Sequence, residues 1–167
     1  MKKESSYQKF EITYSKFAGG IFRYIYFRVS DYELARDITS ELFVKYWKLL
    51  IQEKKIENHK ALLYFIAKGL IIDHYRKKNH TKRVSLESVD ERLLGLLDTV
   101  ENSLLQKQKL EEIYAKIKLL KKSYQDMLFL HYVEDLTVKE IAYIQKKKEN
   151  AIRVLLHRAL RSLKECL

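Results

Sequence analysis

Proline is absent from this sequence of 167 residues, glycine occurs only four times, and cysteine occurs once. Helix interiors tolerate proline and glycine poorly, so their scarcity favours an all-α fold. A β-sheet needs tight turns, and the Asn-Gly and Asp-Gly pairs that form hairpin turns are also missing. The single cysteine, Cys166, excludes an internal disulfide and a zinc site of the Cys-x-x-Cys type.

Other absences narrow the possible functions. No apolar run reaches the roughly 18 residues of a membrane span, and the first residues lack the apolar stretch of a signal peptide. We therefore expect a cytoplasmic protein without membrane insertion. The sequence also has no glycine-rich phosphate loop, and Cys166 has no evident neighbouring base. The histidines, none of them at metal-ligand spacing, are His59, His74, His80, His131 and His157. We expect no metal, no cofactor and no enzymatic activity.

Positive charge is abundant and unevenly distributed. The formal net charge of +11 suggests a polyanionic partner such as nucleic acid, although a soluble protein from a lysine-rich proteome would show the same excess. Residues 1–83 carry 18 basic and 9 acidic side chains, residues 84–103 carry 1 and 5, and residues 104–167 carry 14 and 8. The pattern predicts two small basic domains, residues 1–83 and 104–167, joined by a flexible acidic linker over residues 84–103.

Apolar residues recurring every three or four positions predict three helices in the first domain, over residues 7–28, 32–50 and 59–78. Ser30 or Asp31 is placed to cap the second helix. One broad face of the third helix carries Leu62, Phe65, Ile66, Gly69, Leu70 and Asp73.

A second stripe of that third helix alternates rings and cations. It consists of Tyr64, Lys68, Ile71 and Tyr75, and the helix ends in Arg76, Lys77 and Lys78. Such a stripe suits a nucleic-acid strand whose bases stack on the rings while its phosphates are neutralised. A helix buried on two sides, with basic residues at its C-terminus for the helix dipole, would show the same pattern.

The second domain is predicted to hold a helix over residues 104–119 and three more after it. Ser123 is a good N-cap for the first of these three, and Thr137 with Glu140 forms a capping box for the next. After residues 145–149, a last basic helix follows. Two short helices, a brief turn and a longer basic helix are typical of a helix-turn-helix domain.

Two blocks in the first domain carry a family resemblance. Residues 35–47, A-R-D-I-T-S-E-L-F-V-K-Y-W, resemble the pattern A-E-D-L-V-Q-E-V-F-L-R-L-W of region two in extracytoplasmic-function sigma factors. Residues 61–78 resemble the next block of that family, A-W-L-Y-R-I-A-R-N-L-A-I-D-H-L-R-R-R. The chain departs from these patterns at Ser40 (usually Gln), Leu62 (Trp), Phe65 (Arg) and Gly69 (Asn).

The resemblance implies two roles for the first domain. The second helix would dock on a coiled coil in the largest subunit of core RNA polymerase, although ordinary solvated charge is the plainer interpretation of its polar residues taken alone. Its contact residues would be Asp37, Ser40, Glu41 and Lys45. The third helix and the loop before it, residues 51–60, would engage the minus-ten element of the promoter and capture an unstacked base. The DNA contacts there would be Lys60, Tyr64, Lys68, Tyr75, Arg76, Lys77 and Lys78.

The second domain resembles region four of the same family. Residues 126–142 are similar to E-V-L-L-L-R-Y-V-E-G-L-S-Y-E-E-I-A, and residues 151–159 to T-V-K-S-R-L-H-R-A. The last helix would then enter the major groove at the minus-thirty-five element. Residues expected near base edges or phosphates are Lys148, Glu149, Asn150 and Arg153, with His157 and Arg158 on the DNA backbone. His157 is equally well interpreted as a half-buried packing residue.

The turn of this second domain departs from the family pattern. Residues 145–148 read Q-K-K-K where the family usually has L-G-I-S. Losing the glycine would strain a left-handed turn residue, and losing the isoleucine would weaken packing between the two helices. The three lysines add affinity for phosphates without adding sequence choice.

We therefore expect a monomeric sigma factor with core RNA polymerase and promoter DNA as partners, and an anti-sigma factor as its inhibitor. The alternative is a self-sufficient helix-turn-helix regulator, which would normally dimerise to read paired half-sites. The block at residues 35–47 argues against that alternative, because such a regulator has no use for a polymerase-docking helix.

Overall fold

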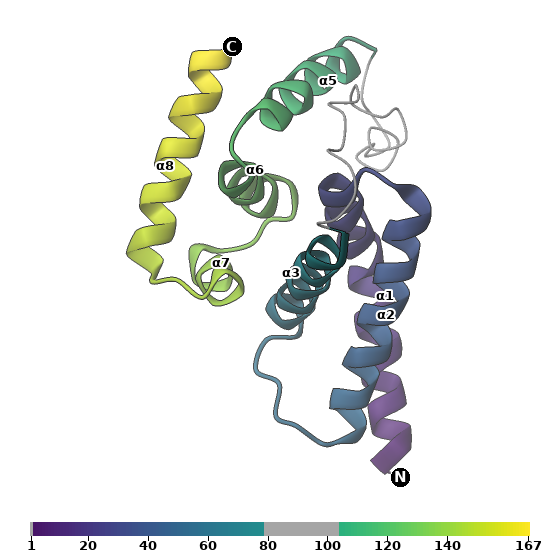
Figure 1. Cartoon of the computed structure of the whole chain (residues 1–167). Coiled ribbons are helices and arrows are strands. Elements are labelled where there is room, and N and C mark those ends of the chain that lie inside the picture. The colour runs from purple at the N-terminus through teal and green to yellow at the C-terminus, as the bar shows by residue number, and fades with distance from the viewer. Residues whose placement is uncertain (1, 79–103) are drawn as a thin grey trace. The chain divides into compact units, whose positions relative to one another are not determined.

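The computed structural model describes residues 2–78 and 104–167, and every element in those ranges is helical. The chain divides into two compact units, residues 1–83 and 84–167 (Figure 1). The expected all-α class is confirmed for the described residues. The predicted linker, residues 84–103, lies outside them.

Unit 1 contains three helices: α1 (Lys2–Val29), α2 (Tyr32–Ile51) and α3 (His59–Lys78). The bounds of α3 agree with the sequence prediction, and α2 is longer by one residue. Helix α1 begins five residues earlier than predicted and continues through Gly19 and Gly20. A Cβ atom added at Gly19 would meet nothing within 4 Å, so no neighbouring group requires a glycine there.

Two residues, Ser30 and Asp31, form the short turn between α1 and α2. Ser30 adopts a left-handed conformation (φ 53°), and its amide bonds to the carbonyl of Tyr26. Asp31 then caps α2, and its carboxylate accepts a hydrogen bond from the Leu34 amide at 3.0 Å. Of the two predicted caps, the structure therefore uses Asp31.

Aromatic rings join the helices of unit 1. Phe10 of α1 lies edge-on to Phe43 of α2, with ring centroids 6.1 Å apart, and Tyr24 of α1 lies 5.5 Å from Tyr64 of α3. The fully buried interior includes Ile21, Tyr24, Ile25, Phe27, Leu42, Tyr46 and Leu63. Because burying each large side chain contributes roughly 1.5–3 kcal/mol, this interior fixes the three helices as one body.

Unit 2 contains α5 (Leu104–Leu119), α6 (Lys122–Leu128), the π-helix η1 (Phe129–Val133), α7 (Val138–Gln145) and α8 (Glu149–Cys166). The bounds of α5 agree with the prediction, but the predicted cap of α6 is wrong. The N-cap is Lys121 rather than Ser123, and its side chain makes no capping bond. Packing sets this start: Gln125 is buried, and its amide donates to the carbonyls of Lys118 (3.0 Å) and Leu120 (2.8 Å) at the end of α5.

The π-helix that follows α6 was not expected from the sequence. A π-helix is defined by hydrogen bonds between residues five positions apart, and here the Glu134 amide donates to the Phe129 carbonyl at 3.1 Å. Asp135 turns left-handed (φ 52°), and the Leu136 amide bonds back to the Leu130 carbonyl at 3.0 Å. One surplus residue is thus accommodated before the helix-turn-helix begins.

Helices α7 and α8 form the expected helix-turn-helix. The capping box is confirmed: Thr137 Oγ1 accepts from the Glu140 amide at 3.2 Å, and Glu140 Oε2 accepts from the Thr137 amide at 2.8 Å. The turn contains Lys146 at φ 51° and ψ 45°. This is the position where the family pattern has glycine, so the predicted left-handed residue is confirmed and is a lysine.

Candidate functional site

The outer face of α2 carries the residues that the resemblance assigns to polymerase docking. Asp37, Ser40, Glu41 and Lys45 are all exposed. Lys45 pairs with Glu41 at 3.4 Å, but both side chains are about half exposed, so the pair adds little stability and is readily exchanged for a partner's groups. Val44 lies on the same face and is 53% exposed. The sequence analysis did not assign Val44 to docking, although an apolar residue four positions after Ser40 on a polar helix face indicates an exposed contact.

A groove of about 320 Å³ runs beside this face, between α2 and α3. It brings Asp37 and Glu41 together with Asp73 and His74 of α3, two residues that the sequence analysis did not assign to docking. Burial lowers the pKa of His74, the charge of Lys78 lowers it further, and Asp31 opposes both. Lys45 and Lys77 also line the groove, so it carries both signs of charge.

The stripe of α3 that was expected to face nucleic acid is partly buried, as the alternative of a helix buried on two sides predicted. Tyr64 and Ile71, expected to face nucleic acid, are each only 1% exposed, and Tyr64 packs against Tyr24. The broad face is mixed: Leu70 is buried, Phe65 is half-buried, and Gly69 and Asp73 are exposed. The assignment of Tyr64 to a stacking surface is therefore corrected, because its ring lies in the interior.

Other members of the expected stripe are intermediate. Lys60 and Lys68 are half-buried. Tyr75 donates its hydroxyl hydrogen to the Arg28 carbonyl at 2.8 Å, and burial raises its pKa. Its ring therefore helps to hold α3 on α1. The basic C-terminus of the helix, Arg76, Lys77 and Lys78, is exposed as expected.

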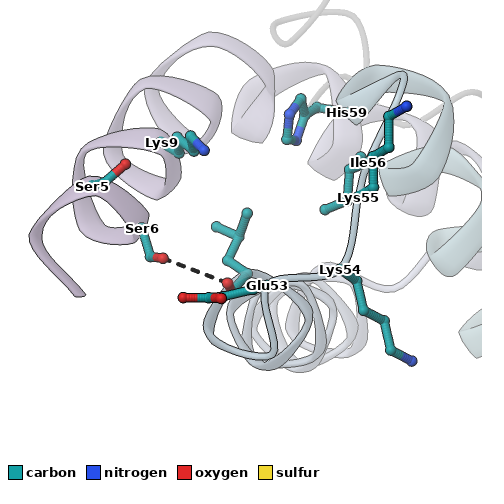
Figure 2. Close-up of a pocket in the computed structure, with 9 residues that line it drawn as sticks. Ser5, Ser6, Lys9, Glu53, Lys54, Lys55, Ile56 and His59 are labelled. Carbon is teal, nitrogen blue, oxygen red and sulfur yellow. Dashed lines mark hydrogen bonds between the residues drawn. The ribbon is translucent and has the colours of Figure 1, made fainter. Parts of the chain in front are cut away.

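A pocket of about 390 Å³ opens where the α2–α3 loop meets α1 (Figure 2). Ser5, Ser6 and Lys9 line one side, residues 53–56 line the other, and His59 lies between them. Ser6 Oγ donates to the Leu50 carbonyl at 3.4 Å and ties the start of α1 to the end of α2. Three lysines and one glutamate around the opening make it cationic. The loop was predicted to contact DNA, but the α1 side of the pocket was not.

On α8, the predicted base-reading residues are exposed and linked to one another. Arg153 donates to Glu149 Oε2 and to Asn150 Oδ1, each at 3.0 Å. His157 and Arg158 are exposed too, so packing does not explain His157. Lys148 is the N-cap of the helix, and its side chain makes no capping bond.

Within residues 2–78 and 104–167, no three His, Cys, Asp or Glu side chains gather closely enough to hold a metal ion. Of the helices that the structure describes, none is long and apolar enough to cross a membrane.

Comparison with known proteins gives consistent matches in both units. The family models for Sigma-70 region 2 and for Sigma-70, region 4 match residues 13–81 and 110–163. The chain is 28% identical to the ECF RNA polymerase sigma factor BldN of Streptomyces coelicolor, over 92% of this chain and 58% of BldN. It is 26% identical to the ECF RNA polymerase sigma factor SigM of Bacillus subtilis, over 90% of each.

A solved structure agrees with the fold. The sigma factor RpoE, in complex with the anti-sigma factor NepR from Bartonella quintana, superposes with a TM-score of 0.74 over 95% of this chain and 96% of RpoE, at 17% identity. The two family models fall one in each unit and together cover most of the described residues. The chain therefore belongs to the extracytoplasmic-function family of RNA polymerase sigma factors, which act in transcription initiation.

Proposed function

We propose that this chain binds core RNA polymerase through the outer face of α2, directs it to specific promoters and helps to melt them. The observation that carries the proposal is the pairing, in one chain, of an exposed acidic and apolar helix face with a separate helix-turn-helix unit. The polymerase supplies all the bond chemistry, so the chain itself is no enzyme. It acts in the bacterial cytoplasm.

Docking uses the exposed groups of α2. Carboxylates at Asp37 and Glu41, one helical turn apart, are positioned for basic side chains on a partner helix. Val44, which is exposed on the same face, adds an apolar contact with the partner. Such a face combines charge, which steers association, with a small apolar centre, which holds the complex.

Unit 2 reads duplex DNA with the N-terminal half of α8. Arginine suits guanine edges in the major groove, asparagine suits adenine, and glutamate accepts a hydrogen bond from cytosine. Glu149 and Asn150 contact Arg153 in the free protein, and because these contacts are exposed they are readily exchanged for DNA. The lysines of the turn, residues 146–148, neutralise the flanking phosphates.

Unit 1 engages the opened strand. The cationic pocket beside the α2–α3 loop accepts one unstacked base, so the contacts made there offset the cost of unstacking. The strand continues along the open face of α3, past Phe65 and Gly69, towards the basic C-terminus of the helix. At 1.5 Å per residue, this helix spans roughly 30 Å, enough for several nucleotides.

Two weak sites on one chain bind promoter DNA more tightly than either does alone, because the first contact raises the effective concentration of the second. An inhibitor that covers both units would silence the chain efficiently. Since RpoE was solved with an anti-sigma factor, we extend the proposal to an anti-sigma partner for this chain.

Transcription in vitro with purified core polymerase and genomic fragments tests the proposal. We expect new transcripts whose mapped start sites share upstream elements, and a monomeric mass for the free protein on size exclusion. A chain that forms dimers and binds DNA but never associates with core polymerase would instead be a self-sufficient regulator.

A further inference from the structure

Val154 is an exposed apolar residue of α8, and it lies between side chains that are proposed to contact DNA. Its side chain is 47% exposed, whereas Ile152 and Leu156 on either side of it are buried. Single exposed apolar residues are common on protein surfaces, so the position of this one decides what it can do. The family pattern has serine here, so the apolar side chain is a departure of this chain from that pattern.

Helical geometry directs Val154 away from the interior of unit 2. The buried residues Ile152, Leu156 and Ala159 define the inner side of α8. At about 100° per residue, Val154 lies within about 20° of the direction opposite to their mean, and the exposed Asn150 lies about 40° from Val154. The outer edge of the second helix in a helix-turn-helix faces the base pairs of the major groove. Val154 therefore lies near the centre of the edge that the proposed function inserts into that groove.

Neither folding nor phosphate binding accounts for a valine at this place. Valine is a poorer helix former than alanine, arginine or lysine, because its branched Cβ restricts its rotamers. At 47% exposure, Val154 contributes little to the core. Its side chain has no donor or acceptor, so it can neither bind a phosphate nor form a hydrogen bond with a base edge. Against the polar edge of a G·C pair, it would remove water without replacing the lost hydrogen bonds.

We propose that Val154 reads the C5-methyl group of one thymine in the minus-thirty-five element. This methyl group is the apolar group that base pairs present in the major groove, and it distinguishes thymine from the other three bases. Contact with Val154 removes apolar surface of both groups from water, which favours the complex. The inference rests on the proposed function, which places α8 in the major groove.

Uracil substitution in promoter duplexes tests the contact, because uracil differs from thymine only by the missing methyl group. The full chain is assembled with core polymerase, and the promoters are those whose minus-thirty-five elements follow from mapped start sites. Each thymine of the element, on either strand, is replaced in turn. At one position we expect the affinity to fall about fourfold, which corresponds to the loss of one buried methyl group.

Two variants show whether Val154 makes the contact. In Val154→Ala, the loss of affinity caused by uracil at that position should largely disappear, because the shorter side chain no longer reaches the methyl group. Leu119→Ala is the matched control, since it shortens an aliphatic side chain that is 68% exposed at the end of α5, outside the helix-turn-helix. This control should retain the fourfold loss. Both variants change exposed side chains, so their circular dichroism spectra should match that of the wild type.

The outcomes separate this inference from the proposed function. Tolerance of uracil at every position, or an equal loss in wild type and Val154→Ala, would refute thymine reading by Val154 while leaving the sigma activity intact. A minus-thirty-five element without thymine would have the same consequence. If polymerase assembled with the chain bound no promoter, the proposed function and the reading of thymine would both be refuted.

Discussion

Lys146, in the turn of the helix-turn-helix, has a left-handed backbone conformation. We therefore predict that replacing it with glycine stabilises the fold, although glycine usually destabilises one. Lys146 lies at φ 51°, a conformation that costs an L-residue about 1–2 kcal/mol. Glycine avoids that cost but loses more backbone freedom on folding, which takes back roughly 0.5–1 kcal/mol. We therefore expect Lys146→Gly to stabilise unit 2 by about 0.5–1 kcal/mol, a rise in melting temperature of about 2–8 °C.

The neighbouring residue offers a charge-matched control. Lys147 does not have a positive φ, so no backbone strain is relieved by Lys147→Gly. This variant removes the same charge and only increases the conformational entropy of the unfolded chain. It should destabilise unit 2 by about 0.5–1 kcal/mol. The two variants should therefore change the stability of unit 2 in opposite directions, while any effect of the lost charge is the same in both.

Thermal unfolding followed by far-ultraviolet circular dichroism measures both variants. The only tryptophan, Trp47, lies in α2, so its fluorescence reports on unit 1 and should not change. Equal shifts in the same direction for both glycine variants would show that no strain is stored at Lys146.

Three further predictions concern the other surfaces. Gly19→Ala should stabilise unit 1 by about 0.5–1 kcal/mol, because the added methyl meets no neighbour; a lower urea midpoint by Trp47 fluorescence would contradict this. Glu41→Lys should weaken binding to core polymerase with an unchanged circular dichroism spectrum, and unchanged affinity would argue against docking by the α2 face. Arg153→Ala should cost about 1–3 kcal/mol of promoter affinity if the side chain reads a base, whereas an equal loss on scrambled DNA would reassign it to a phosphate.

Local signals in the sequence predicted much of the fold. The ends of α3 and α5 and the capping box at Thr137 depend on residues within a few positions of one another, whereas the left-handed turn at Lys146 was expected from the family resemblance alone. Two misses depend on packing between elements. The start of α6 is set by the buried Gln125 and its bonds to α5, and the π-helix η1 depends on how its residues pack in unit 2.

The stacking stripe of α3 was misassigned for a related reason. Leu62, Phe65 and Ile66 lie on one side of the helix, Tyr64 and Ile71 on the other, and both sides are apolar. Periodicity cannot choose a buried face when apolar residues surround the helix. The exposed candidates on α2 and α8 were located well because those helices have a clear polar side.

The π-helix η1 makes the orientation of α8 depend on the number of residues in this segment more than on their identity. A regular α-helix advances about 100° per residue, so deleting one residue between positions 129 and 133 would restore α-helical spacing and rotate all that follows by that angle. Because α8 packs directly on α6 through Ile152, Leu156 and Ala159, the deletion would force the core of unit 2 to rearrange and so shift the base-reading edge of α8. Substitutions in this segment alter packing, whereas a single insertion or deletion would redirect recognition.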